Sequence, residues 1–270
     1  MVPTILAEAL AALAASPDAT IVAGGTDVMV EVNAGHRPLR AAVVVNRVAE
    51  LCTWRHEGAA LHLGAGVTWS QVEAAPLADW VPALAQAART VGSPQIRHAG
   101  TVGGNLGTCS PAGDGLPVLA ALDAVVHLTS VQGTRSLPFG EFMVGPKRTS
   151  RRPDELITGI TVPVLHGWQG YSKVGVRNAM VIATASVALV TDIDGRSVRL
   201  ALGSVGPTIL RCPDAEAYVA ANVDFEGGRV SAAVVARFAE LARAAARPID
   251  DHRSTAGYRR HAVGVLAGRL

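Results

Sequence analysis

The sequence predicts an α+β protein of two domains, with the boundary near residue 165. The chain has 270 residues, which is enough for two buried cores. Segments typical of strands and of helices alternate in the first part, and a break from Pro163 to Gly170 follows. After this break the pattern changes to strands followed by helices, which favours a sheet with helices laid on one side. We therefore expect domains at 1–165 and 166–270.

Residues 1–53 are predicted to form the first of two lobes in the N-terminal domain. Leucines at helical spacing predict a helix over residues 4–15. A strand at 21–23 then leads into the segment Ala23-Gly24-Gly25-Thr26-Asp27-Val28, whose two glycines predict a turn. A second strand at 42–46 completes this lobe.

Residues 54–165 are predicted to form the second lobe. Its strand at 61–67 ends in Gly-x-Gly, but the third glycine that a Rossmann dinucleotide fingerprint requires is missing. Thr68 or Ser70 is instead expected to cap a short helix. The other predicted elements are helices at 82–89 and 116–122, a loop at 91–100, a strand at 124–129, and closing segments at 138–142 and 154–160.

The C-terminal domain is predicted to begin with strands and to end with helices. A strand at 171–174 and a long apolar segment at 182–190 come first, and a strand at 198–202 follows the turn Asp194-Gly195. Helices are predicted near 214–221, 230–246 and 255–268. The Arg-rich run 243–260 is interpreted as a solvated helix face or a protein interface.

Composition argues against two classes of protein. A net charge of +2, with 17% charged and 4% aromatic residues, is too balanced for a nucleic-acid-binding protein. The mean hydropathy is +0.30, yet no apolar run reaches the roughly 18 residues that a membrane span requires. The first ten residues lack a basic start and include Glu8, so no export signal is predicted.

The three cysteines, Cys52, Cys109 and Cys212, are odd in number, far apart, and never form a Cys-x-x-Cys pair. This favours a reducing cytoplasm and argues against an iron–sulfur cluster or structural zinc held by this chain alone. The spacing His-Glu-x-x-His is also missing, so no metal site is predicted.

Two glycine-rich segments carry the main functional signal. In Thr101-Val102-Gly103-Gly104-Asn105, adjacent glycines allow consecutive backbone N–H groups to face one bulky anion. The segment 23–28 contains a similar Gly-Gly-Thr turn after an apolar run. We expect the two to converge on one diphosphate from opposite sides, although each alone is also compatible with a plain turn.

Together these segments resemble the two FAD-binding loops of the flavoprotein (medium) subunit of molybdenum hydroxylases, a family that includes carbon monoxide dehydrogenase and xanthine dehydrogenase. The likeness covers essentially the whole chain. The other matching stretches are Ser110-Pro111-Ala112-Gly113-Asp114, 119–124, Pro153-Asp154-Glu155-Leu156-Ile157, Tyr171-Ser172-Lys173, 250–253 and Tyr258-Arg259-Arg260. The resemblance implies a two-lobed α+β FAD-binding domain of the vanillyl-alcohol-oxidase (PCMH) type and a C-terminal domain of the carbon-monoxide-dehydrogenase flavoprotein type.

The resemblance also implies which residues hold FAD. One side of the diphosphate would be held by Ala23, Gly24, Gly25, Thr26, Asp27 and Val28, and the other by Thr101, Gly103, Gly104 and Asn105. Asp114 matches a carboxylate that accepts hydrogen bonds from cofactor hydroxyls, or alternatively caps the helix that starts before Leu116. The first loop lacks the histidine that carries covalent FAD in distant relatives, so binding is expected to be non-covalent.

Two further matches concern the flavin ring. Ile157 matches an apolar side chain packed against the flavin, and is otherwise a core strand residue. Lys173 matches a lysine near the isoalloxazine, where a fixed cation would favour the reduced, anionic flavin; the alternative is a surface lysine without a role. Some relatives have acidic residues after the position of Arg177, whereas this chain has Asn178-Ala179-Met180-Val181, which leaves the electron acceptor open.

Three functions follow as hypotheses. The first is an electron-transfer subunit, in which FAD takes electrons from [2Fe–2S] clusters of a small partner subunit and delivers them to NAD or another acceptor. A large molybdopterin subunit would then hydroxylate a purine or other N-heterocycle, an aldehyde or a CO-like substrate, in a dimer of three-subunit units. The second is a self-sufficient FAD oxidase or reductase with a substrate pocket between its domains. The third is a non-redox module whose glycine segments are only turns.

Overall fold

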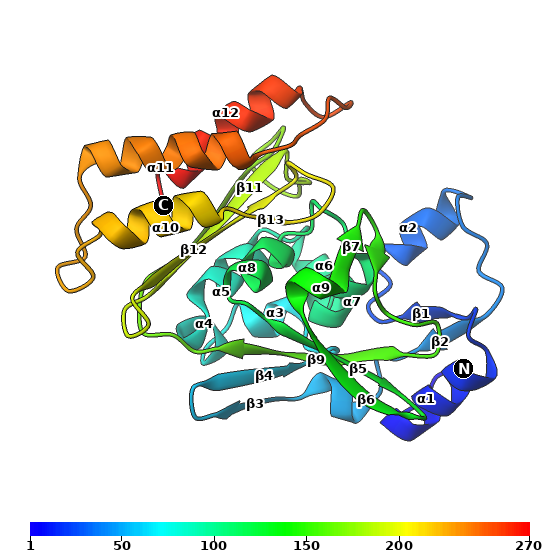
Figure 1. Ribbon diagram of the computed structural model, residues 1–270. Helices are drawn as coiled ribbons and strands as arrows, with labels where there is room; N and C mark the ends of the chain where they lie inside the picture. Colours follow the sequence, from blue (N-terminus) through cyan, green and yellow to red (C-terminus); the bar gives the residue numbers. More distant parts are fainter.

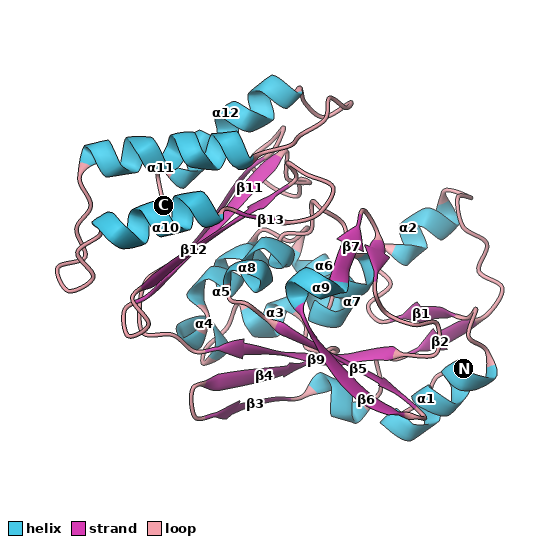
Figure 2. Ribbon diagram, viewed as in Figure 1, coloured by secondary structure: helices cyan, strands magenta, loops and turns pink.

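Figure 1 shows the computed structural model, which describes residues 1–270. Its strands form a five-stranded sheet, a four-stranded sheet and two sheets of two strands each. The two large sheets lie on opposite sides of a layer of helices, as the colouring by secondary structure makes clear (Figure 2). The predicted α+β class is therefore confirmed.

The first 53 residues form a small unit around a parallel pair of strands. β1 (Thr20–Val22) pairs with β2 (Ala42–Val44), and α1 (Leu6–Ala15) covers them together with a 3₁₀ helix at Ala49–Cys52. The predicted helix and both strands of this lobe are present. A further helix, α2 (Val28–Asn33), was not predicted; it begins at the last residue of the first glycine segment, so the turn itself covers only residues 23–27.

The five-stranded sheet is antiparallel throughout, with the order β3-β4-β9-β5-β6. One face is apolar because alternate residues such as Leu61, Leu63 and Ile160 point to the same side and are buried. The strands are β3 (Trp54–Glu57), β4 (Ala60–Gly64), β5 (Val125–Ser130), β6 (Gly133–Pro138) and β9 (Leu156–Pro163).

Short helices cover the buried face of this sheet. They are α3 (Trp69–Val72), α4 (Leu77–Trp80), α5 (Pro82–Arg89), α6 (Pro94–Ala99), α7 (Val102–Thr108), α8 (Gly115–Ala121) and α9 (Phe139–Phe142). The hairpin of β7 (Met143–Gly145) and β8 (Arg148–Thr149) follows α9. Thr68 caps α3 through a capping box, as predicted.

Two expectations for this helical layer were wrong. Residues 91–100 are not all loop, because Ser93 caps α6 and Pro94 occupies its first position. Residues 101–105 are not a turn but the start of α7, whose N-cap is Thr101. Glycines disfavour helices, and α7 forms because this cap and the burial of Val102 and Leu106 outweigh that cost.

The C-terminal part has a four-stranded antiparallel sheet in sequence order, with three helices on one side (Figure 1). The strands are β10 (Gln169–Val174), β11 (Ala185–Asp192), β12 (Ser197–Gly203) and β13 (Leu210–Arg211). The helices are α10 (Pro213–Asn222), α11 (Ala232–Ala245) and α12 (Ala256–Ala267). All three lie where the sequence predicts them.

The second face of this sheet packs against α5 and α8 of the preceding part. Along β11, Ala188 and Val190 join the core of the helical layer, whereas Val187 and Leu189 join the core under α10 to α12. α8 is consequently enclosed from both sides, and all seven of its residues are buried. None of the helices is long and apolar enough to cross a membrane.

Because α8 is enclosed on both sides, we predict that Leu119→Ala lowers the free energy of unfolding by about 2–5 kcal/mol. The cavity cannot collapse toward solvent, since Leu119 is fully buried. Urea denaturation measures the change, and Val131→Ala, at a position 57% exposed, serves as the control with an effect within about 0.5 kcal/mol. Equal stability of the two variants would contradict this packing.

Candidate functional site

The first glycine segment lies directly against the chain that enters α7. A Cβ built on Gly24 would lie 1.8 Å from the carbonyl oxygen of Ala99, so the two backbones touch at a position where only glycine fits. Thr108, at the end of α7, donates a hydrogen bond from its hydroxyl to Asp27 Oδ2 at 3.2 Å. A Cβ on Gly104 would be 3.9 Å from that of Ala23. The two glycine segments therefore lie side by side.

The first segment leaves a run of backbone donors unpaired. None of the six N–H groups from Ala23 to Val28 donates a hydrogen bond within the protein. Gly25 has a φ of 71°, a value that glycine adopts without strain and that allows the amides to turn in this way. Consecutive unpaired N–H groups at such a turn form a concave site for an anion.

The second segment differs from its expected role. Val102 N–H donates to Val67 O at 2.9 Å, Gly103 N–H to Ala65 O at 2.8 Å, and Gly104 N–H to Thr101 Oγ1 at 2.9 Å. The amides of Gly103 and Gly104 are thus engaged in holding α7 against the end of β4, and of the expected donors only the Thr101 N–H is unpaired. A Cβ on Gly103 would lie 2.4 Å from Ala65 Cβ, so this glycine is required by packing.

Asn105 connects the second segment to the loop before α8. Its side chain lies beside Gly113 and Gly115, because a Cβ on either glycine would come within 3.1 Å of the Asn105 amide group. The Asn105 Oδ1 atom is buried and has no hydrogen-bond partner. A buried polar atom without a partner is costly, and it marks a position where a ligand donor would be stabilising.

Asp114 does not cap α8, although it occupies the N-cap position. Its carboxylate instead accepts hydrogen bonds from the Tyr171 hydroxyl at 2.8 Å and from Lys173 Nζ at 2.7 Å. The side chains of Asp114 and Lys173 are 10% and 8% exposed. The capping alternative and the alternative of a surface lysine are therefore both wrong.

Lys173 uses all three of its N–H groups. Besides Asp114, the ammonium donates to the carbonyl oxygens of Thr90 at 2.9 Å and of Val181 at 3.0 Å. It therefore ties β10 to the end of α5, to the start of α8 and to the loop after β10. Its charge is balanced by the Asp114 carboxylate, so the fixed cation expected from the resemblance is one half of a buried ion pair.

Burial is the main influence on the protonation of this cluster. It raises the pKa of Asp114 above its usual range, while the charge and hydrogen bond of Lys173 and the hydrogen bond of Tyr171 oppose that rise. Burial, together with the nearby Asp114, raises the pKa of Tyr171 well above its usual value. Tyr171 thus remains a hydrogen-bond donor at physiological pH.

A cleft of about 640 Å³ opens beside this cluster, lined by residues of 89–97 and 171–181. Its cations are partly engaged: Arg97 pairs with Glu73, and Arg177 donates to the carbonyl oxygens of Ala179 and Met180. The sequence did not identify Arg89 or Tyr171 as site residues. Tyr171 and Lys173 are two residues apart on one strand, so both side chains lie on the same face of the sheet. This spacing is the sequence feature from which Tyr171 could have been identified as a site residue.

Ile157 lies on β9 and is buried in the core below α7. A Cβ on Gly107 would be 3.8 Å from Ile157 Cδ1, so the Ile157 side chain packs against α7, the helix that begins with the second segment.

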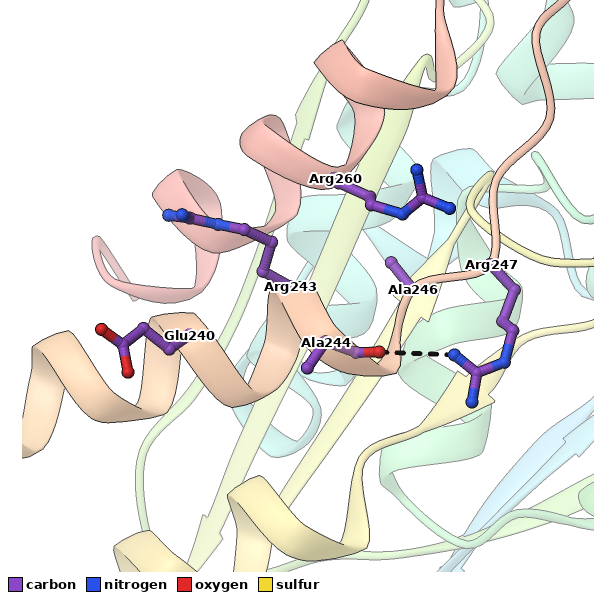
Figure 3. A pocket seen from close by; sticks show the side chains of 6 residues that line it. All are labelled: Glu240, Arg243, Ala244, Ala246, Arg247 and Arg260. Atoms are coloured by element: carbon purple, nitrogen blue, oxygen red, sulfur yellow. Dashed lines mark hydrogen bonds between the residues drawn. The ribbon is translucent and has the colours of Figure 1, made fainter.

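A second hollow, of about 420 Å³, lies between α11 and α12 and contains Arg243, Arg247 and Arg260. Figure 3 shows that their guanidinium groups point in different directions, and Arg247 donates to the carbonyl oxygen of Ala244 at 3.3 Å. These arginines do not converge on one point, so this hollow is not the candidate site.

Comparison with known proteins places these features in a family context. Residues 1–165 match the model described as "FAD binding domain in molybdopterin dehydrogenase", and residues 171–270 match "CO dehydrogenase flavoprotein C-terminal domain". The chain is 30% identical to the carbon monoxide dehydrogenase medium chain of Hydrogenophaga pseudoflava, over 99% of this chain and 93% of that protein. It is 36% identical to the nicotinate dehydrogenase FAD-subunit of Eubacterium barkeri, over 66% of this chain and only 62% of that protein.

Solved structures of related enzymes have the same fold as this chain. Carbon monoxide dehydrogenase from Hydrogenophaga pseudoflava superposes with a TM-score of 0.90 and 28% identity, covering 100% of this chain and 94% of that chain. Quinoline 2-oxidoreductase from Pseudomonas putida 86 superposes with a TM-score of 0.91 at 24% identity, covering 100% of this chain and 93% of that chain, which shows the same fold.

We predict that Gly24→Ala destabilises the protein by about 1–3 kcal/mol, because the added methyl forces residues 23–28 away from Ala99. Gly140→Ala is the matched control, since nothing lies within 4 Å of a Cβ there and the residue is in α9. Thermal unfolding of both variants measures the difference. If Gly24→Ala proved as stable as Gly140→Ala, the close approach of the two segments would be refuted.

We also predict that Lys173→Met lowers the free energy of unfolding by about 3–5 kcal/mol at neutral pH, because it leaves the Asp114 carboxylate buried without its cation. Loss of Lys173 removes an influence that lowers the pKa of Asp114, so that pKa rises further. Consider the pH range between the pKa of Asp114 in the folded wild-type protein and its higher pKa in the folded variant. In that range Asp114 of the folded variant retains a proton that the unfolded chain has released. Its stability therefore falls relative to wild type as pH rises, by about 1.4 kcal/mol per pH unit.

Urea denaturation as a function of pH measures this difference. The double variant Lys173→Met, Asp114→Asn is the control, because it has no buried carboxyl left to titrate at this position. Its free energy of unfolding should therefore not show the added fall with rising pH that Lys173→Met shows relative to wild type. A difference between Lys173→Met and wild type that stays constant with pH would contradict the assignment.

Proposed function

The chain belongs to the family of FAD-binding medium subunits of molybdenum hydroxylases, and from this premise we propose that it relays electrons through FAD within a multi-subunit oxidoreductase. The single observation that carries the proposal is the run of unpaired amides from Ala23 to Val28 beside the start of α7. This run is the donor set that a diphosphate requires.

The residues of the site fit the cofactor. The amides of residues 23–28 and the Thr101 N–H would hold the diphosphate, and the unpaired Asn105 Oδ1 would accept a hydrogen bond from a cofactor hydroxyl. Gly103 and Gly104 would contribute through the position of α7 rather than through their N–H groups. Thr26 would add its hydroxyl as a donor at the same turn, and the Asp27 carboxylate would hold the turn to α7 through its hydrogen bond from Thr108.

When bound, FAD supplies the redox chemistry, since it can take electrons from an iron–sulfur partner and release them to an acceptor. The chain itself positions the ring. The Asp114–Lys173 pair keeps the helical layer and β10 together beside the cleft, and Ile157 supports α7 from below. We propose that the pair acts on the flavin as a dipole, because the Asp114 carboxylate offsets the charge of Lys173.

The proposed complex contains a large molybdopterin subunit and a small subunit with [2Fe–2S] clusters, arranged as a dimer of heterotrimers in the cytoplasm. A reducing compartment is proposed because the three cysteines are odd in number and far apart in the sequence. The acceptor, NAD or another molecule, would enter the cleft lined by 89–97 and 171–181. The substrate hydroxylated on the large subunit would be a purine or other N-heterocycle, an aldehyde or a CO-like molecule.

We predict that the native chain purifies with about one FAD, which acid precipitation releases because no covalent bond holds it. Asn105→Ala weakens FAD binding about tenfold, equivalent to about 1.4 kcal/mol, through loss of one hydrogen bond. Asn222→Ala, at the end of α10, leaves it unchanged. Fluorescence titration of the apoprotein measures both. Absence of flavin from the wild-type chain would overturn the proposal, and turnover of a small substrate without partner subunits would favour a self-sufficient enzyme.

A further inference from the structure

Arg259 of α12 is a buried arginine whose contacts lie far from the cleft in sequence. The residue is only 5% exposed, and α12 covers the side of the four-stranded sheet that faces away from the helical layer (Figure 1). Arg259 Nη1 donates hydrogen bonds to the carbonyl oxygens of Thr184 at 3.1 Å and of Ser204 at 2.8 Å, and Nη2 donates to Asp251 Oδ1 at 2.6 Å. Because a buried charge is stable only when it is paired and hydrogen-bonded, these contacts fix the side chain and its partners relative to one another.

The two carbonyl oxygens that Arg259 contacts lie at the same end of the C-terminal sheet. Thr184 directly precedes β11 and Ser204 directly follows β12, and these strands pair with Ser186 opposite Gly203. The loop that ends at Thr184 contributes residues 175–181 to the lining of the cleft. Arg259 therefore connects the end of a cleft-lining loop to the segment that follows β12.

Ser204 links this end of the sheet to the loop 110–114 of the candidate site. Its N–H donates a hydrogen bond to the carbonyl oxygen of Pro111 at 2.8 Å. The same loop lies against Asn105, because a Cβ on Gly113 would be 2.7 Å from Asn105 Nδ2. The position of Ser204 thus bears on the position of the loop, and through the loop on Asn105.

The backbone of Ser204 needs support from its surroundings. Its φ is 63°, a left-handed value that residues other than glycine adopt only at a cost in free energy. The space around it is also tight, since a Cβ on Gly203 would lie 2.8 Å from Pro117 Cγ. The hydrogen bond from Arg259 to the Ser204 carbonyl oxygen is a contact that can hold this strained conformation.

We propose that Arg259 is a positioning residue of the FAD site, which holds Ser204 so that its N–H sets the loop 110–114 against Asn105. This inference rests on the proposed function. The hydrogen bonds of Arg259 all lie within the C-terminal part, so it acts through Ser204 and not by touching the cofactor. The Asp114–Lys173 pair attaches the other end of the loop to the same sheet. With both attachments the orientation of the loop is fixed, whereas one alone leaves it free to pivot.

The first test measures FAD affinity of the full chain by fluorescence titration of the apoprotein. Arg259→Lys keeps the positive charge beside Asp251, but an ammonium does not reproduce the planar fork that reaches all three acceptors. We expect FAD to bind about tenfold more weakly. Arg260→Lys, at the exposed neighbouring position, retains the wild-type affinity. Asp251→Asn weakens the same buried pair while leaving the Ser204 contact in place, so it is the control for stability and also retains FAD affinity.

A double-mutant cycle with Asn105→Ala separates positioning from a general loss of stability. If Arg259 acts through the loop on Asn105, the double variant loses less FAD affinity than the product of the two single losses. Losses that simply multiply would contradict the proposal. Wild-type affinity in Arg259→Lys, or an equal loss in Asp251→Asn, would overturn it as well. Absence of FAD from the wild-type chain would instead refute the proposed function, so the two failures are distinguishable.

Hydrogen exchange of the wild-type chain provides a second readout, which does not depend on the folding of a variant. Saturating FAD is expected to slow exchange of the Ser204 amide by about tenfold, because opening of its bond to Pro111 loosens a loop that the cofactor holds. The Gly195 amide, which donates to Asp192 Oδ1 in the turn before β12, is the control and exchanges at the same rate with and without FAD. Unchanged exchange at Ser204 would overturn the proposal.

Discussion

The buried pair of Asp114 and Lys173 is the contact on which the arrangement of the two halves depends. Removing two charges from water is costly, and the cost is tolerated here because both carboxylate oxygens and all three ammonium protons have partners. These partners belong to α5, to the loop before α8, to β10 and to the loop after it. The same contact therefore sets the spacing between the helical layer and the C-terminal sheet, and with it the shape of the cleft.

The two glycine segments contribute to the site in different ways. In residues 102–104 the backbone N–H groups donate hydrogen bonds that hold the start of α7 against the end of β4, so this segment is fixed in position. In residues 23–28 the amides stay unpaired, and contact with Ala99 holds the backbone in place without using its donors. A site built in this way is ordered before its ligand arrives, which lowers the entropic cost of binding.

Most of the fold could be predicted, because strong local signals, such as Pro82 followed by an alanine-rich segment, determine α5 to the residue. α6 and α7 could not, since glycines and prolines indicate turns unless tertiary packing supports a helix. The resemblance identified both Asp114 and Lys173 as site residues, but not their contact, because they are 59 positions apart and local patterns carry no information over that distance. The hydrogen bond from the Gly103 N–H could not be predicted either, because its acceptor, the carbonyl oxygen of Ala65 at the end of β4, is far away in the sequence.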